Sequence, residues 1–191
     1  MPRQQSVRLR DQEQPWRSVP MPGANLNLEL VPLEAHGNAF TILGRFPPEF
    51  RRMEAGGYRA AEDVLVLAGR LELEDQSYET GDLVHIPAGY LRTSMFSPDG
   101  CLVLAWFSGP ADFRPPDELH AVTAGLRSVK PASADGCVLA TDVSRWSVVD
   151  APDRPMDADA VDLQLTMWTR AGAEWPGAQP RRIVTRTAHF S

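Results

Sequence analysis

The chain has 191 residues, which is enough for one well-buried domain or for one domain with a substantial appendage. Hydrophobic residues make up 43% of it and charged residues 23%, as in an ordinary globular protein. The net charge of −6 argues against a nucleic-acid partner, because phosphate binding needs a clustered basic surface. The polar N-terminus shows no signal peptide, and the longest apolar runs are too short to span a bilayer. We therefore expect a cytoplasmic protein without a membrane partner.

Short segments separated by 17 prolines and 14 glycines follow one another along the chain, which favours strands and turns over long helices. Residues 25–33 alternate apolar and polar side chains, which is the period of a half-buried strand. Residues 63–75 are interpreted as two strands joined at Ala68 and Gly69. Further strands are expected at 39–46, 83–87, 90–96 and 101–109. About seven or eight short strands at this spacing are typical of sandwiches and barrels.

The C-terminal third has a different pattern. Residues 110–135 show no clean periodicity, and residues 136–191 return to strand-like character. The predicted organisation is an N-terminal arm at 1–25, a barrel at 26–114, a linker at 115–135 and an extension at 136–191. We expect this extension to pack on the barrel, either as extra strands or as a degenerate second half.

Two sets of spaced residues mark the middle of the chain. Gly81, Pro87 and Gly89 stand in GDLVHIPAGY with the spacing G-x5-P-x-G, and Glu62 and Gly69 fit E-x6-G. With these motifs, residues from about 26 to 114 resemble the cupin superfamily, and within it the ChrR-like group of single-barrel cupins. The resemblance implies an all-β fold, the cupin double-stranded β-helix or jelly-roll barrel, here with extra C-terminal strands.

The metal ligands of the cupin motifs are missing from this sequence. Arg92 occupies the histidine position of the second motif, and Phe96 the asparagine position. The HxH pair of the first motif falls in EAGGYRA, which contains no histidine. Only Glu62 remains, and the permanent charge of Arg92 opposes a cation beside it. We therefore predict no metal and no cofactor, and either a Glu62–Arg92 ion pair or an anionic ligand in that place.

Three residues are candidates for catalysis. Glu62 is either a relic carboxylate satisfied by an arginine or a general base. Tyr58 either donates a hydrogen bond into the barrel or only fills it. His85 faces away from the barrel if Ile86 faces inward, and with the register shifted by one residue it becomes a proton-transfer group in the cavity.

Four residues are candidates for ligand binding. Arg92 is the first, as an anion clamp. Arg59 follows Tyr58 in the region of the missing HxH pair, and Tyr90 stands in the PAGY loop, where it either guards the barrel mouth or lies on the surface. Trp106 is most simply a core residue.

Three functions compete on these observations. The first is a small-molecule-binding cupin without the usual metal site, acting as a metal-independent isomerase, cyclase or lyase on an anionic metabolite. The second is a non-enzymatic ligand-sensing or accessory cupin, as in the ChrR-like group. A metal-dependent dioxygenase ranks last. The expected partners are a small anionic ligand and a second copy of the chain in a homodimer.

Overall fold

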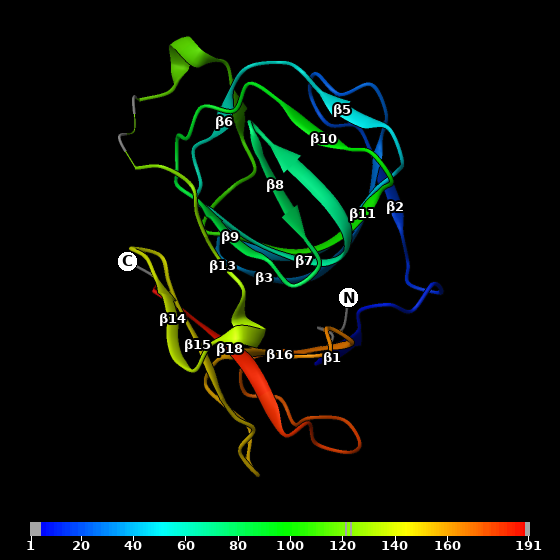
Figure 1. Cartoon of the computed structure of the whole chain (residues 1–191), viewed down its shortest axis with the longest axis vertical. Helices are drawn as coiled ribbons and strands as arrows, with labels where there is room; N and C mark the ends of the chain where they lie inside the picture. The colour runs from blue at the N-terminus through cyan, green and yellow to red at the C-terminus, as the bar shows by residue number, and fades with distance from the viewer. Residues whose placement is uncertain (1–4, 121, 123, 190–191) are drawn as a thin grey trace. The chain divides into compact units, whose positions relative to one another are not determined.

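The computed structural model describes residues 5–120, 122 and 124–189, and strands dominate it (Figure 1). The chain divides into two compact units: one is Glu13–Ser128, and the other takes in the described residues of 1–12 and 129–191. The predicted barrel at 26–114 and extension at 136–191 lie within these units, while the predicted arm and linker are each divided between them. Among the described residues, no helix is long and apolar enough to cross a membrane.

The strands of Glu13–Ser128 curve into a ring in Figure 1. Seven of them pair in the order β13-β9-β7-β11-β4-β3-β2, β8 pairs with β7, β10 pairs with both β5 and β7, and β12 pairs with β6. The strands are β2 (Arg17–Val19), β3 (Leu28–His36), β4 (Ala39–Phe46), β5 (Phe50–Arg52), β6 (Gly57–Tyr58), β7 (Glu62–Leu73), β8 (Gln76–Glu79), β9 (Leu83–Ile86), β10 (Met95–Ser97), β11 (Cys101–Phe107), β12 (Phe113–Arg114) and β13 (Arg127–Val129), with a short 3-10 helix, η1 (Pro116–Glu118), after β12.

Strand β7 is one continuous strand, which corrects the prediction of two strands joined at Ala68 and Gly69. Gly69 has φ +78°, and a Cβ there would lie 2.2 Å from the carbonyl oxygen of Gly100. Only glycine fits such a bend without strain. The pairing register between β7 and β11 also shifts next to this bend. Strand β7 therefore bends without ending. It pairs with β9 and β11 before the bend and with β8 and β10 after the bend.

The core of the barrel follows the alternation of these strands. On β9 and β11 every second residue faces the interior, and on β7 the inward residues change from even to odd numbers across the bend. The opposite residues of the same strands face the other side of the sheet. The buried interior residues on these three strands are Val64, Val66, Leu71, Leu73, Val84, Ile86, Cys101, Val103, Ala105 and Phe107.

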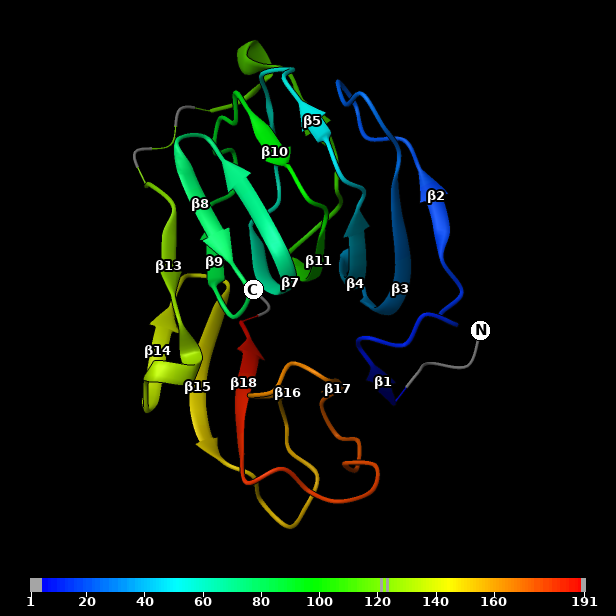
Figure 2. The same ribbon diagram turned by 45° about the vertical axis from the view of Figure 1, so that its right-hand side comes forward.

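The second unit contains a six-stranded antiparallel sheet in the order β1-β17-β16-β18-β15-β14 (Figure 2). It supplies the extra C-terminal strands that the sequence predicts, and it also takes in an N-terminal strand. Its strands are β1 (Ser6–Arg8), β14 (Gly136–Ala140), β15 (Ser144–Asp150), β16 (Asp159–Asp162), β17 (Met167–Thr169) and β18 (Arg182–Ala188), and a 3-10 helix, η2 (Pro131–Ser133), precedes β14.

Candidate functional site

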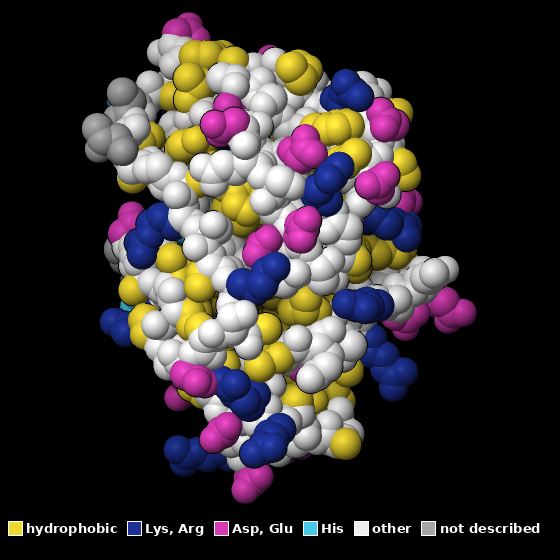
Figure 3. All heavy atoms as spheres, in the orientation of Figure 1, with side chains coloured by type: hydrophobic (Ala, Val, Ile, Leu, Met, Phe, Trp, Pro, Cys, Tyr) yellow, Lys and Arg dark blue, Asp and Glu magenta, His cyan; other side chains and the backbone are white. Residues whose placement is uncertain are grey.

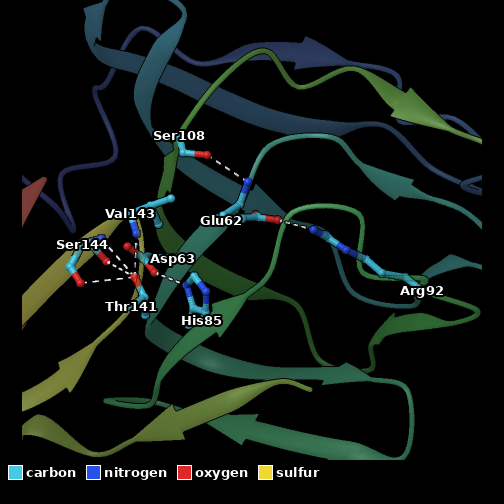
Figure 4. A network of polar contacts seen from close by, with 9 residues as sticks. Glu62, Asp63, His85, Arg92, Ser108, Thr141, Val143 and Ser144 are labelled. Carbon is cyan, nitrogen blue, oxygen red and sulfur yellow. Dashed lines mark hydrogen bonds and ion pairs between the residues drawn. The ribbon is translucent and has the colours of Figure 1, made fainter. Parts of the chain in front are cut away.

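The interior of the barrel holds a buried ion pair between Glu62 and Arg92. Nη2 of Arg92 donates to Oε2 of Glu62 at 2.8 Å, with Arg92 2% exposed and Glu62 8% exposed (Figure 4). Glu62 begins β7 and points inward in step with Val64. Arg92 follows the turn at Gly89, where φ is +74°, and its backbone exchanges two hydrogen bonds with Gly56. The sequence left open an ion pair or an anionic ligand, and the structure contains the ion pair.

A second arginine, Arg52, belongs to the same interior and was missed from the sequence. It ends β5, whose burial pattern is buried, exposed, buried across Phe50, Arg51 and Arg52. Arg52 therefore lies on the inward face with Phe50 and is 1% exposed. The alternation of this short strand was the signal that could have found it, but β5 lies outside both cupin motifs. We call Arg52, Tyr58, Glu62 and Arg92 the interior cluster.

The interior cluster carries two guanidinium groups and one carboxylate. Nη2 of Arg92 is used by Glu62, but its Nε and Nη1 have no hydrogen-bond partner among the described residues. Nη1 of Arg52 is likewise unpartnered within the described part of the chain, and its Nη2 reaches only the Glu54 carbonyl at 3.5 Å. Burial lowers the pKa of Arg52 from its usual value, and repulsion from Arg92 adds to this. Buried N–H groups of this kind are normally hydrogen-bonded, so the cluster is under-satisfied.

Aromatic rings surround the two guanidinium groups. Arg92 lies over the ring of Tyr58 at 4.8 Å, and Arg52 lies over the ring of Phe113 at 4.0 Å. Tyr58 meets Phe113 and Phe107 edge to face, each at 5.6 Å between ring centroids. Burial, followed by the nearby Glu62 carboxylate, raises the pKa of Tyr58, which keeps its hydroxyl protonated. The Tyr58 ring therefore fills part of the interior, and its hydroxyl group is neutral.

His85 does not join this cluster. It pairs with Asp63 across β9 and β7, while Ile86 pairs with Glu62, so Ile86 faces inward and His85 faces the other side of the sheet. Figure 4 shows Asp63 directed toward His85 and Glu62 directed toward Arg92. Nδ1 of His85 lies 2.8 Å from Oδ1 of Asp63, and His85 is buried. A role for His85 in proton transfer beside Glu62 is therefore excluded by the strand register.

Trp106 is also on the far side of the sheet. On β11 the inward residues are Ala105 and Phe107, and Trp106 pairs with Asp63 and with Thr41 on the opposite face. It is fully buried, which agrees with the core interpretation and removes it from the ligand-binding candidates for the barrel interior.

The two remaining candidates lie at the edge of the barrel. Arg59 is exposed and lies 3.9 Å from Glu118 in a surface ion pair, so it does not enter the interior. Tyr90 is partly buried and packs against the core. Burial raises the pKa of Tyr90, with a smaller contribution from Glu74. Tyr90 thus keeps a place next to the interior cluster, and Arg59 does not.

The residues of the interior do not fit a metal ion. Among residues 5–120, 122 and 124–189, no group of three or more His, Cys, Asp and Glu side chains comes together to hold one. Glu62 is the one carboxylate in the interior cluster, and its Oε2 already accepts from Arg92. A guanidinium group is always protonated and cannot coordinate a cation. The unpartnered atoms of the cluster are N–H groups, which donate hydrogen bonds and do not coordinate cations.

The outer surface offers no comparable concentration of charge on the face drawn in Figure 3. Over the described residues visible there, basic and acidic side chains are interspersed among apolar and neutral ones. The charges of the interior cluster are buried inside the barrel, which makes this cluster the candidate site.

Comparison with known proteins agrees with this architecture. No family model matches the sequence, and no curated protein matches it. A protein of Nostoc punctiforme PCC 73102, assigned provisionally as a dioxygenase, is similar with a TM-score of 0.64 and 15% identity, over 99% of this chain and 84% of that one. Protein Ylba from E. coli is similar with a TM-score of 0.55 and 10% identity, over 92% of this chain and 88% of that one.

A third similar structure is a protein from Pseudomonas aeruginosa, provisionally described as glyoxylate-induced. Its TM-score is 0.52 at 12% identity, and the match covers 91% of this chain and 84% of that one. Identities this low establish the fold alone. The chain has the cupin fold, a jelly-roll barrel of β-strands, as its sequence motifs predict.

Proposed function

We propose that the barrel binds a small anionic metabolite in its interior, without a metal ion. The observation that carries this proposal is the charge imbalance of the interior cluster, where two buried guanidinium groups face one carboxylate and three of their nitrogen atoms lack partners within the described residues. Leaving a buried charged donor unsatisfied costs more than an ordinary hydrogen bond contributes. An anion that accepts from these groups would remove that cost.

Binding without catalysis is the function that these residues support best. His85, the candidate proton donor from the sequence, lies on the other face of the sheet, and Glu62 is held by Arg92. A ligand-sensing or accessory role therefore needs nothing beyond the interior cluster. A homodimer and a place in the ChrR-like group stay predictions.

A metal-independent isomerase, cyclase or lyase is the second candidate, because Glu62 and Tyr58 share the interior with the proposed anion. Glu62 would act as base and the protonated Tyr58 hydroxyl as acid, with Arg92 orienting the substrate. Catalysis predicts that the ligand, once found, is converted to a product that NMR detects. It also predicts that Glu62→Gln keeps ligand binding and loses conversion.

The proposal is tested by a thermal-shift screen of organic and inorganic anions, each beside an uncharged analogue, at constant ionic strength. Mass spectrometry of small molecules released from the denatured protein accompanies it. A ligand that binds only the native state raises the melting temperature in a saturable way. We expect at least one anion to do so and its uncharged analogue to fail. If no anion stabilises the protein, or if the purified protein carries stoichiometric iron, nickel or zinc, the proposal is wrong.

A further inference from the structure

The unpartnered nitrogen atoms of the interior cluster come from two different parts of the barrel wall. Arg92 reaches inward from the segment after the Pro87 turn, and Arg52 reaches inward from β5. Arg52 lies over the ring of Phe113 at 4.0 Å, Arg92 lies over the ring of Tyr58 at 4.8 Å, and these two rings meet edge to face at 5.6 Å between their centroids. The two guanidinium groups therefore lie on neighbouring rings, which is the arrangement that one anion needs to accept from both.

The net charge of the cluster limits the charge of the ligand. Two guanidinium groups and the Glu62 carboxylate leave one positive charge among residues that are 1%, 2% and 8% exposed for Arg52, Arg92 and Glu62. One negative charge on a ligand neutralises it. A dianion such as a phosphate monoester would leave a net negative charge beside Glu62 in a poorly solvated place, which is unfavourable.

The surroundings of the cluster limit the rest of the ligand. The rings of Tyr58 and Phe113 cover the two guanidinium groups, and Phe40 stacks on Phe107 at 4.6 Å beside Tyr58. The groups that these contacts bring against the two guanidinium groups are aromatic rings. A ligand body that is apolar and small suits such a lining, because each added polar group would lose its hydration without gaining a partner.

We infer that Arg52 and Arg92 together bind the carboxylate of a small monocarboxylic acid whose apolar body packs against the aromatic rings. This inference rests on the proposed function and makes it more specific. It assigns Arg52, which no cupin motif marks, as a ligand-binding residue equal in importance to Arg92. Glu62 then positions Arg92 and selects against more highly charged ligands.

The test uses acetate, benzoate and inorganic phosphate as probes, with acetamide and benzamide as the uncharged analogues of the two carboxylates. Binding is measured by calorimetry and by the chemical shifts of arginine side-chain nitrogens, on the full chain at fixed ionic strength. The variants are Arg52→Gln and its matched control Arg51→Gln. Arg51 is the neighbouring residue on β5, and it is exposed and paired with Glu49 on the surface. Neither variant removes the partner of Glu62, so both should fold.

We expect acetate, benzoate or both to bind the unmodified protein, and Arg51→Gln to bind equally well. Arg52→Gln should weaken the affinity about 10- to 100-fold, because it removes a hydrogen bond between charged groups. Glu62→Gln should instead strengthen binding several-fold, since it removes a competing negative charge. Unchanged affinity in Arg52→Gln overturns the assignment of Arg52 and leaves the proposed function standing. Binding of phosphate in preference to both carboxylates overturns the ligand class, and binding of no anion overturns both proposals.

Discussion

The two units of this protein use buried charge in different ways. In the six-stranded unit, the buried carboxylate of Asp162 accepts hydrogen bonds from the backbone N–H groups of Thr166 and Met167 at 2.7 and 2.9 Å, and from the Thr166 hydroxyl at 2.6 Å. It closes the turn between β16 and β17. In the barrel, Arg92 is hydrogen-bonded to the Glu62 carboxylate, but two of its nitrogen atoms have no partner within the described chain. One nitrogen atom of Arg52 is likewise without a partner there.

The difference distinguishes a buried charge that the fold explains from one that the fold leaves unexplained. A buried carboxylate that accepts from nearby backbone groups is fully explained by the turn it stabilises. A buried guanidinium group with free N–H groups is not explained by the fold that holds it, because folding could have used an apolar side chain in the same place. Four substitutions or modifications test this contrast, and the largest effect comes from the ion pair itself.

Arg92→Met should lower the free energy of unfolding by about 3–5 kcal/mol, because it leaves the Glu62 carboxylate buried without its cation. Chemical denaturation followed by tryptophan fluorescence measures this loss. The double variant Glu62→Gln/Arg92→Met removes both charges and should recover most of the stability. If the double variant is as unstable as the single one, the two residues do not act as a pair.

Asp162→Ala should lower the free energy of unfolding by about 2 kcal/mol, because buried donors of the β16–β17 turn lose their acceptor. Its matched control is Asp157→Ala, since Asp157 is an exposed aspartate of the same unit and should change stability very little. Affinity for a carboxylate should be unchanged in both variants. A loss of ligand affinity in Asp162→Ala would contradict the division of roles between the units.

Arg52→Met should change the free energy of unfolding by less than about 1 kcal/mol in a buffer without organic anions. The methionine keeps much of the side-chain volume and removes a buried charge for which, among the described residues, the structure shows a backbone carbonyl and no carboxylate as hydrogen-bond acceptor. The same denaturation measurement, made beside Arg92→Met, compares the two arginines directly. A loss as large as that of Arg92→Met would make Arg52 a structural residue and weaken its assignment to a ligand.

The reactivity of the two cysteines compares the two units without any substitution, because one thiol lies in each unit. Burial raises the pKa of Cys101 in the barrel core to about 12, although a hydrogen bond from Ser97 partly opposes this. A raised pKa keeps the thiol protonated, so at pH 8 Cys101 should not react with iodoacetamide, while the exposed Cys137 should. Mass spectrometry should find one modified thiol in the native protein and two in denaturant. Rapid modification of Cys101 would mean that the barrel opens readily.

Much of the barrel could be predicted from the sequence because its turns need particular residues. Gly69 and Gly89 both have positive φ, as their motif positions predict, and the Glu62–Arg92 pair follows from the spacing of those motifs. Spacing along the chain fixed which residues stand at the ends of strands. These positions depend on local backbone geometry, which a single sequence records directly.

The remaining parts of the site depend on register and on contacts between distant strands. A shift of one residue moves a side chain to the other face of a sheet, so the sequence could not decide the face of His85 or Trp106. Arg52 stands on a three-residue strand, which is too short for its alternation to stand out from the flanking residues. The aromatic covering of the guanidinium groups joins β6, β11 and β12, and no local pattern reports that.

The bend at Gly69 has a consequence for how the charges are spaced. Glu62 stands at the start of β7, and at the far end Leu73 pairs with Met95, which in turn pairs with Arg52. Glu62 thus stands on β7 itself, and Arg52 is joined to the other end of the same strand through two backbone pairings. Because the bend at Gly69 lies between these two points, a substitution there would change the distance between the Glu62 carboxylate and the Arg52 guanidinium without replacing either residue.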